Sequence, residues 1–173
     1  MKQLHLILIS LTILLSGCGI TSSQSGSARK TEKSAKRSED FAKTSTLIES
    51  GNYIYRIQSI NPTGGRTIQS TSLYTMKASN GTFEAYLPYF GRAYQADLGG
   101  KGGIEFKGDP EDLTIVKNSD KYSVTVTFKI KGSNDRYNVI FVVGSNGYGT
   151  LTIDSQNRQT ISYYGTVGEL TEE

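Results

Sequence analysis

The residue with the most specific chemistry in this sequence is Cys18, the only cysteine of the chain. It follows Leu15-Ser16-Gly17 at the end of a leader in which Lys2 precedes a short apolar run. A branched aliphatic residue, a small residue, glycine and cysteine after such a run are typical of a bacterial lipoprotein signal, in which the thiol is acylated and the cysteine becomes the first mature residue. We therefore predict a signal peptide at 1–17 and lipidation of Cys18.

The apolar run of the leader, Leu4–Leu15, is too short for a permanent membrane span, which needs roughly 20 apolar residues. The alternative is an ordinary secretory signal with a chance cysteine near its cleavage site. Two or more acyl chains anchor a protein stably, so an acylated Cys18 would hold the domain at a bilayer. The first predicted partner is thus a membrane, reached through the N-terminal lipid.

Processing at Cys18 would also remove two reactive side chains from the mature domain. His5, the only histidine, lies in the leader, and the thiol of Cys18 carries the lipid. A Ser-His-Asp triad, a thiolate nucleophile and a zinc site with nitrogen and sulfur ligands each need one of these groups. The sequence therefore excludes these mechanisms and disulfide formation, and it indicates no cofactor and no metal.

Carboxylates are the groups with which a hydrolase could still work, since a glycosidase needs two of them and no histidine. Asp97 and Glu105 flank a glycine-rich loop, and more acidic residues cluster in Asp109–Asp112. A glycine loop followed by an acidic turn is also ordinary protein surface, and Asp109–Asp112 lacks the spacing of a known calcium loop. A carboxylate-dependent glycan hydrolase therefore stands as the alternative function, with no catalytic residue assigned.

Aromatic and cationic side chains gather in three segments that break the strand pattern, 61–66, 86–94 and 157–165. In the middle segment Pro88 donates no ladder hydrogen bond, which argues against a paired strand. Aromatic rings beside arginine are typical of recognition surfaces, but the same residues can also close the end of a β-sheet core. The candidate ligand-binding residues are Arg66, Tyr89, Phe90, Arg92, Tyr94, Arg158 and Tyr163.

A recognition surface makes two demands on these candidates. At least one ring in the Tyr89-to-Arg92 stretch must be exposed to solvent. At least one of Arg66, Arg158 and Tyr163 must lie near Arg92, because separate chain segments have to converge to make a pocket.

A single helix is predicted before the irregular segments, over Ser38–Ser50. Ser38 is a good N-cap residue, and Gly51 suits the position that follows a helix. Phe41 and Ile48, seven positions apart, fall on one side of such a helix. We expect this narrow apolar stripe to pack on a sheet.

After Gly51 the apolar residues recur with a period of two, most clearly in Tyr122–Ile130. Asn80-Gly81 predicts a type I′ hairpin turn. The continuous apolar run in Tyr137–Val143 suggests cover on both faces, with the helix as the second cover. Strands are predicted at Tyr53–Ile60, Leu73–Ser79, Thr82–Leu87, Gly103–Phe106, Leu113–Asn118, Lys121–Lys131, Tyr137–Val143, Gly149–Ile153 and Gln159–Val167. The predicted fold is mainly β: an antiparallel meander of eight or nine short strands, as a sandwich or a partly closed barrel, with one N-terminal helix on the sheet.

Between the signal and this domain, residues 18–37 are rich in Ser, Gly, Lys and Arg and poor in apolar side chains. We predict a disordered basic tether, because such a segment cannot bury enough apolar surface to offset its chain entropy. Between Gly19 and Asp40 there are five basic and three acidic residues, whereas from Phe41 onward there are thirteen of each, so the basic excess lies in the tether. A domain without net positive charge argues against nucleic acid as a partner of the domain at 38–173.

Three groups of residues, Asn61–Arg66, Tyr86–Tyr94 and Asn157–Gly165, together with the lipobox and Leu47–Tyr53, resemble a lipoprotein family of Bacteroidota, the domain of unknown function 4251. The resemblance covers about Ser38 to Val167 and implies an envelope context and a fold, but no mechanism. Surface-exported lipoproteins of that phylum tend to carry acidic residues just after the lipidated cysteine. Gly19–Ser23 has none, so the resemblance implies the periplasmic side of the outer membrane.

The predicted function is that of a membrane-tethered envelope lipoprotein without enzymatic activity. Its domain is expected to bind a periplasmic glycan, lipid or protein. A deep cleft with two inward-facing carboxylates would favour the hydrolase instead, and a shallow aromatic face would favour binding.

Overall fold

A computed structural model describes residues 24–94, 102–133 and 135–170 of the chain. Cys18 and its leader lie outside the described residues, as does Asp97. The structure divides after residue 35 into two units, and the fold described below belongs to the second, Lys36–Glu173. Within the described ranges, no helix has the length and apolar character that crossing a bilayer requires.

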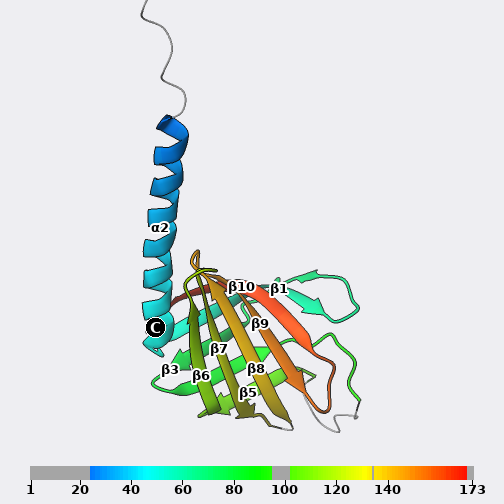
Figure 1. The fold of residues 1–173 in the computed structure, drawn as a ribbon. Helices are drawn as coiled ribbons and strands as arrows, with labels where there is room; N and C mark the ends of the chain where they lie inside the picture. The colour runs from blue at the N-terminus through cyan, green and yellow to red at the C-terminus, as the bar shows by residue number, and fades with distance from the viewer. Residues whose placement is uncertain (1–23, 95–101, 134, 171–173) are drawn as a thin grey trace, which may run out of the picture. The chain divides into compact units, whose positions relative to one another are not determined.

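The helix, α2, spans Gln24–Glu49 and is followed by Gly51 (Figure 1). Its end agrees with the predicted end at Ser50 to within one residue, but its start lies well before the predicted N-cap at Ser38. Residues 24–37, expected to be disordered, are therefore helical in the structure. The physical reason is composition: alanine, lysine, arginine and glutamate are strong helix formers even where no apolar face needs burial.

Ten strands follow the helix, all joined by antiparallel pairing. Nine form one curled sheet in the order β5-β4-β3-β1-β10-β9-β8-β7-β6, and the short β2 pairs only with β1. The strands are β1 Tyr53–Pro62, β2 Ile68–Gln69, β3 Thr75–Ser79, β4 Thr82–Leu87, β5 Ile104–Gly108, β6 Glu111–Asn118, β7 Ser123–Lys131, β8 Arg136–Gly144, β9 Tyr148–Ser155 and β10 Ile161–Glu169. The predicted antiparallel meander with one N-terminal helix is confirmed, as a half-barrel.

The local sequence signals account for most of this topology. Asn80 and Gly81 have positive φ angles of 49° and 86°, as a type I′ turn between β3 and β4 requires. In β7 the predicted alternation is observed, with Val126 and Phe128 buried and Thr127 exposed. The two-residue β2 was not predicted, since so short a pairing has no period of its own.

Strand β8 corrects one prediction. Its apolar run suggested cover on both faces, but Val139 and Phe141 are buried while Ile140 and Val142 keep 44% and 38% of their surface exposed. The helix does not lie on this outer face; its Ile48 belongs to the core cluster that the inner faces of the strands enclose. A run of β-branched residues in β8 therefore reflects strand propensity as well as burial.

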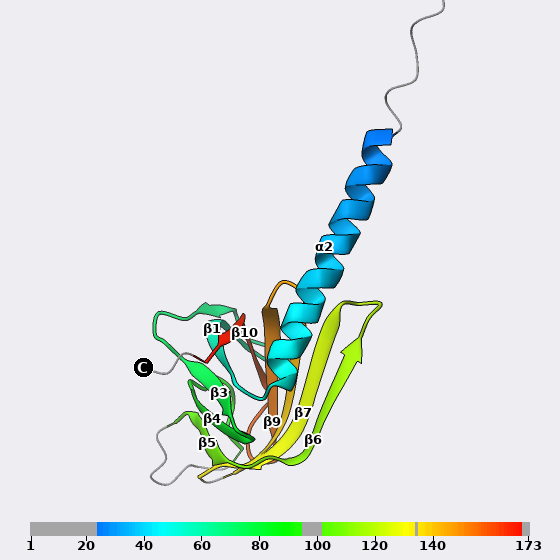
Figure 2. The same ribbon diagram turned by 90° about the vertical axis from the view of Figure 1, so that its left-hand side faces the viewer.

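The half-barrel has two ends, which we call the helix end and the distal end. At the helix end, the ring of Phe41 meets that of Tyr122 edge-on, with centroids 5.9 Å apart, and Thr44 Oγ1 donates to the carbonyl of Ser145 at 3.2 Å. Glu49 pairs with Lys117 of β6 at 2.8 Å. Figure 2 shows the part of α2 from residue 36 onward at the end of the half-barrel where β6 and β7 turn.

The distal end is formed by the opposite ends of the same strands. There β1, β4 and β7 finish, and β8 and β10 begin. At this end Phe106 of β5 makes an isolated bridge to Gly132, just after β7, so the two margins of the sheet approach each other. All three irregular segments of the sequence fall here.

Candidate ligand-binding site

The chain leaves β4 at the distal end and crosses it as an irregular segment, residues 88–94, which we call the strap. The strap is bound to the turn between β9 and β10, residues 156–160, which we call the distal turn. The amide of Tyr94 donates to the carbonyl of Asn157 at 2.8 Å, and the amide of Gln159 donates to the carbonyl of Arg92 at 2.9 Å. Pro88 keeps the strap from joining the sheet, so its backbone groups bond to the turn instead.

Tyr89 fastens the underside of the strap. Its hydroxyl lies 2.7 Å from the carbonyl oxygen of Arg92 and 2.9 Å from that of Gln159, and can donate to either. Gly91 makes this possible, because a Cβ at that position would come within 2.5 Å of the hydroxyl. The half-buried ring packs against the core, and burial raises the pKa of its hydroxyl.

Two further candidates, Arg158 and Tyr163, lie beneath the strap rather than on it. The Arg158 guanidinium stands 5.2 Å from the centre of the Tyr89 ring and donates to the carbonyl of Gly103 at 2.7 Å. Tyr163 is fully buried, and its hydroxyl donates to the carbonyl of Pro88 at 2.8 Å. Burial raises the pKa of Tyr163, so its hydroxyl stays protonated as a donor. Neither side chain can reach a ligand in this structure; both position the strap.

The remaining candidates face solvent. Phe90 and Tyr94 expose 54% and 67% of their surface, and Arg92 beside them is exposed. Arg66 is exposed in the loop after β1, which is fastened to the distal turn by the hydroxyl of Thr63, a donor to the carbonyl of Thr160 at 2.6 Å. The three irregular segments thus converge on the distal turn, and one ring of the Tyr89-to-Arg92 stretch is exposed, as a recognition surface demands.

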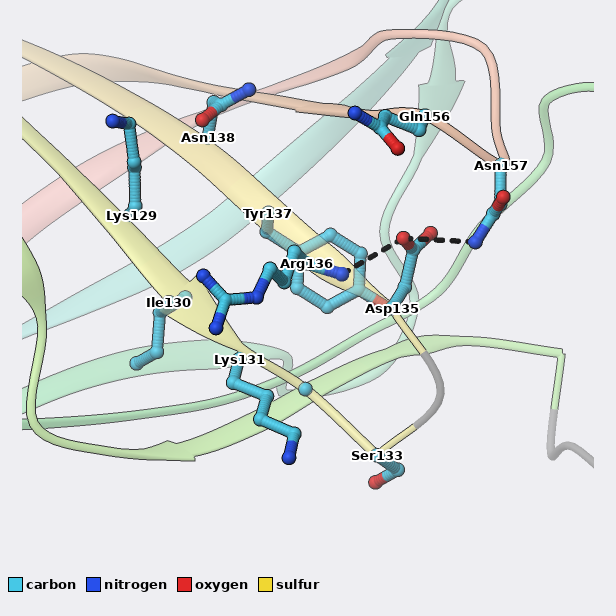
Figure 3. A pocket seen from close by; sticks show the side chains of 11 residues that line it. Lys129, Ile130, Lys131, Ser133, Asp135, Arg136, Tyr137, Asn138, Gln156 and Asn157 are labelled. Atoms are coloured by element: carbon cyan, nitrogen blue, oxygen red, sulfur yellow. Dashed lines mark hydrogen bonds between the residues drawn. The ribbon is translucent and has the colours of Figure 1, made fainter.

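The structure adds a feature that the sequence did not indicate, a half-open cavity of about 440 Å³ beside the strap, which we call the distal hollow (Figure 3). It lies between the turn that joins β7 to β8 and the distal turn. The residues that line it are Lys129, Ile130, Lys131, Gly132, Ser133, Asp135, Arg136, Tyr137, Asn138, Gln156 and Asn157. Asn157 also carries the carbonyl that holds Tyr94, so the hollow and the strap share a wall.

Asp135 ties the two walls of the distal hollow together. Its Oδ1 accepts from the amide of Arg136 at 2.8 Å and from Nδ2 of Asn157 at 3.1 Å (Figure 3). Its Oδ2 is buried and has no hydrogen-bond partner within the described part of the chain. The carboxamide of Asn157 is therefore held in a fixed orientation, with its oxygen left to accept.

Two of the cations in the hollow belong to exposed ion pairs. Lys129 Nζ lies 2.8 Å from Asp112, and Arg136 lies 3.1 Å from Glu111. The hydrogen bond between Lys129 and Asp112 lowers the pKa of the carboxyl and raises that of the ammonium. Exposed pairs of this kind contribute little to stability, so a ligand can compete with them.

The acidic residues considered for hydrolysis lie around a second half-open cavity of about 460 Å³, where β5 meets the end of β7. Glu105 and Glu111 line it, and Asp109 accepts from the hydroxyl of Thr82 at 3.0 Å. Glu111 is also paired with Arg136 at 3.1 Å, so these acidic side chains take part in exposed surface contacts. No cluster of metal-ligating side chains occurs in the described ranges.

Comparison with known proteins gives a family and a fold. The family described as "Domain of unknown function (DUF4251)" matches residues 35–167. A crystal structure of a DUF4251 family protein from Bacteroides eggerthii superposes with a TM-score of 0.58 at 15% identity, covering 79% of this chain and 91% of that one. No curated protein sequence matches the chain significantly. The structural likeness supports the half-barrel and says nothing of a ligand.

Proposed function

We propose, from the premise that this chain belongs to the DUF4251 family, that it is a lipid-anchored envelope protein whose half-barrel binds a glycan without transforming it. Family membership confirms the resemblance drawn from the irregular segments and supplies no activity. The proposal therefore depends on the chain's own surface at the distal end.

The exposed rings of Phe90 and Tyr94 are the observation that carries the proposal. Exposing large aromatic side chains to water costs hydrophobic free energy, and nothing in the barrel core requires them at the surface. Flat apolar rings beside carboxamide groups match a sugar, which offers an apolar C–H face and a rim of hydroxyls. Asn138, Gln156 and Asn157 provide such groups next to the strap, each able to donate and to accept.

The rigid support under the strap favours binding over a mobile loop that closes on a substrate. Tyr89 and Tyr163 fix its backbone from below through bonds to the carbonyls of Arg92 and Pro88, and the guanidinium of Arg158 lies against the Tyr89 ring. A preorganised surface binds with less loss of conformational entropy.

The glycan proposal is tested by titrating the full chain, purified in detergent, with a panel of short neutral and acidic oligosaccharides. Phe90→Ala and Tyr94→Ala are each expected to weaken binding by about 1–2 kcal/mol, which corresponds to roughly fivefold to thirtyfold in Kd. Tyr148→Ala is the matched control, since Tyr148 is an exposed aromatic residue on β9 away from the strap. If no glycan binds, or if all three variants bind like the wild type, the proposal fails.

The anchoring part of the proposal depends on Cys18 and the leader before it. Cys18→Ser is expected to abolish the incorporation of labelled fatty acid and to leave an unprocessed precursor. Fractionation of the envelope would then show whether the lipidated chain sits in the outer membrane facing the periplasm. Continued labelling of the serine variant would contradict the lipobox.

A further inference from the structure

The distal hollow is lined by three cations, Lys129, Lys131 and Arg136, and by one carboxylate, Asp135. Lys131 and Arg136 are directly opposite each other on β7 and β8, so two cations face one another across a strand pair. Like charges in that position destabilise a sheet. Among the described residues Arg136 has an ion-pair partner in Glu111, whereas no ion pair forms at Lys131. An unfavourable local arrangement without compensation is typical of a functional site.

An anion bound between these cations would remove the repulsion. Lys129 lies on the same face of β7 as Lys131, two residues along the strand, so three cations surround one cavity. Glu111 and Asp112 offset two of them through exposed pairs that a bound anion can displace. Figure 3 shows Arg136 and Lys131 on one side of the hollow.

The other side of the hollow carries carboxamides, which suit hydroxyl groups. Asn138, Gln156 and Asn157 lie along it in Figure 3, and Asp135 fixes the carboxamide of Asn157 from behind at 3.1 Å. The Oδ2 of Asp135 is buried behind this wall, so the wall presents to a ligand its carboxamides rather than the carboxylate. A simple inorganic anion would use the cations and leave these groups unsatisfied.

From this arrangement we infer that the distal hollow is the subsite for one acidic sugar unit of the glycan, with its acid group between Lys131 and Arg136 and its hydroxyls on the carboxamide wall. The inference rests on the proposed function, because the neighbouring sugar would lie on the Tyr94 ring. The volume of about 440 Å³ accommodates one monosaccharide. The shared chemistry is a sugar with a negative charge, whether a carboxylate or a phosphate.

The test compares matched acidic and neutral sugars on the full chain in detergent, by calorimetric titration. The probes are a short oligogalacturonate against its methyl ester, and mannose phosphate against mannose. The acidic member of at least one pair is expected to bind about tenfold tighter, the typical effect of one charge-assisted hydrogen bond. This preference should shrink as salt is added. Which pair shows it identifies carboxylate or phosphate as the acid.

Lys131→Gln is expected to abolish the acidic preference while leaving the affinity for the neutral member unchanged. Lys77→Gln, the same change at an exposed position on β3, is expected to retain the preference. Phe90→Ala should weaken both members of a pair equally. Because the wild-type comparison alone is decisive, the test holds even if a variant fails to fold.

Equal binding of the acidic and neutral members in both pairs would overturn the subsite and leave glycan binding intact. Retention of the acidic preference in Lys131→Gln would overturn it as well. No binding of any probe would overturn the subsite together with the proposed function.

Discussion

The two ends of the half-barrel are closed by different chemistry. At the helix end, apolar side chains close the core: Ile48 is fully buried, and Phe41 packs edge-on against Tyr122. At the distal end the strap is held by polar contacts instead, from the hydroxyls of Tyr89 and Tyr163 to the carbonyls of Arg92 and Pro88. The same sheet is therefore closed by an apolar plug of packed side chains at one end, and by a frame of hydrogen bonds around the strap at the other.

This difference assigns stability mainly to the helix end and ligand recognition to the distal end. An apolar plug contributes through burial, and it leaves no group that could select a ligand. In a frame of hydrogen bonds the donors are buried beneath the strap. The outer face of the strap and the distal turn stays accessible to a ligand, and rings, carboxamides and cations are exposed there. We therefore expect substitutions at the helix end to act on unfolding, and substitutions on the outer face of the distal end to act on binding.

The largest difference is expected between Ile48→Ala and Phe90→Ala. Deleting the fully buried Ile48 side chain should cost about 2–5 kcal/mol of unfolding free energy. Removing the exposed ring of Phe90 should change it by less than about 0.5 kcal/mol. Urea unfolding followed by circular dichroism measures both, with the exposed Lys43→Ala as a helix control. Similar costs for Ile48 and Phe90 would show that the strap surface belongs to the core.

The second prediction concerns alkaline pH and three buried tyrosines. Burial raises the pKa of Tyr53, Tyr55 and Tyr163 above the ordinary value near 10. A raised pKa means that the unfolded chain loses these protons first, so their stabilising contribution is full below pH 10 and declines above it. The expected slope is about 1.4 kcal/mol per pH unit for each tyrosine.

Melting curves between pH 8 and pH 12 measure this slope. Tyr163→Phe should reduce the slope by the contribution of one tyrosine, because phenylalanine has no proton to lose. Of the three tyrosines, Tyr163 is the one whose hydroxyl is bonded to the strap, at the carbonyl of Pro88. An unchanged slope in Tyr163→Phe would mean that the distal end opens before the barrel unfolds.

A smaller, local effect is expected from Tyr89→Phe. The variant keeps the ring and loses the hydroxyl that lies 2.7 Å from the carbonyl of Arg92, which should cost about 1 kcal/mol. Hydrogen exchange should accelerate at the amides of Tyr94 and Gln159, which join the strap to the distal turn. Uniform acceleration over the whole sheet would contradict a locally held strap.

The smallest effect on stability is expected from Arg92→Ala. Its backbone carbonyl holds the strap, while its side chain is exposed, so the unfolding free energy should change by less than about 0.5 kcal/mol. Tyr89 and Arg92 appeared equivalent in the sequence, and the structure separates them: Tyr89→Ala is now expected to destabilise the strap. Thermal melting of both alanine variants distinguishes them.

The sequence predicted the strands because their signal is local. The alternation in β7, with Val126 buried and Thr127 exposed, and the turn at Asn80-Gly81 both follow from neighbouring residues alone. The early start of α2 at Gln24 was missed because a polar segment was judged by hydrophobicity, although its residues are good helix formers.

The sequence also indicated the irregular segments and their convergence, since proline, glycine and aromatic residues interrupted the period there. The sequence could not distinguish Arg158 and Tyr163, which are buried beneath the strap, from Phe90 and Tyr94, which are exposed. Which ring faces inward depends on how the strap crosses the distal turn, and that path is set by contacts between residues about 70 positions apart, such as Tyr89 and Gln159.

By itself, then, the sequence determined the faces of the alternating strand β7, the hairpin turn, the family and the absence of imidazole and free thiol from the predicted mature chain, because each of these follows from residue types or short spacings. Only the tertiary structure decided that Lys131 and Arg136 oppose each other and that Asn157 meets Asp135. Such polar residues look like ordinary solvated positions along the chain. They become a site only when the register of β7 with β8 and the packing of two turns bring them around one hollow.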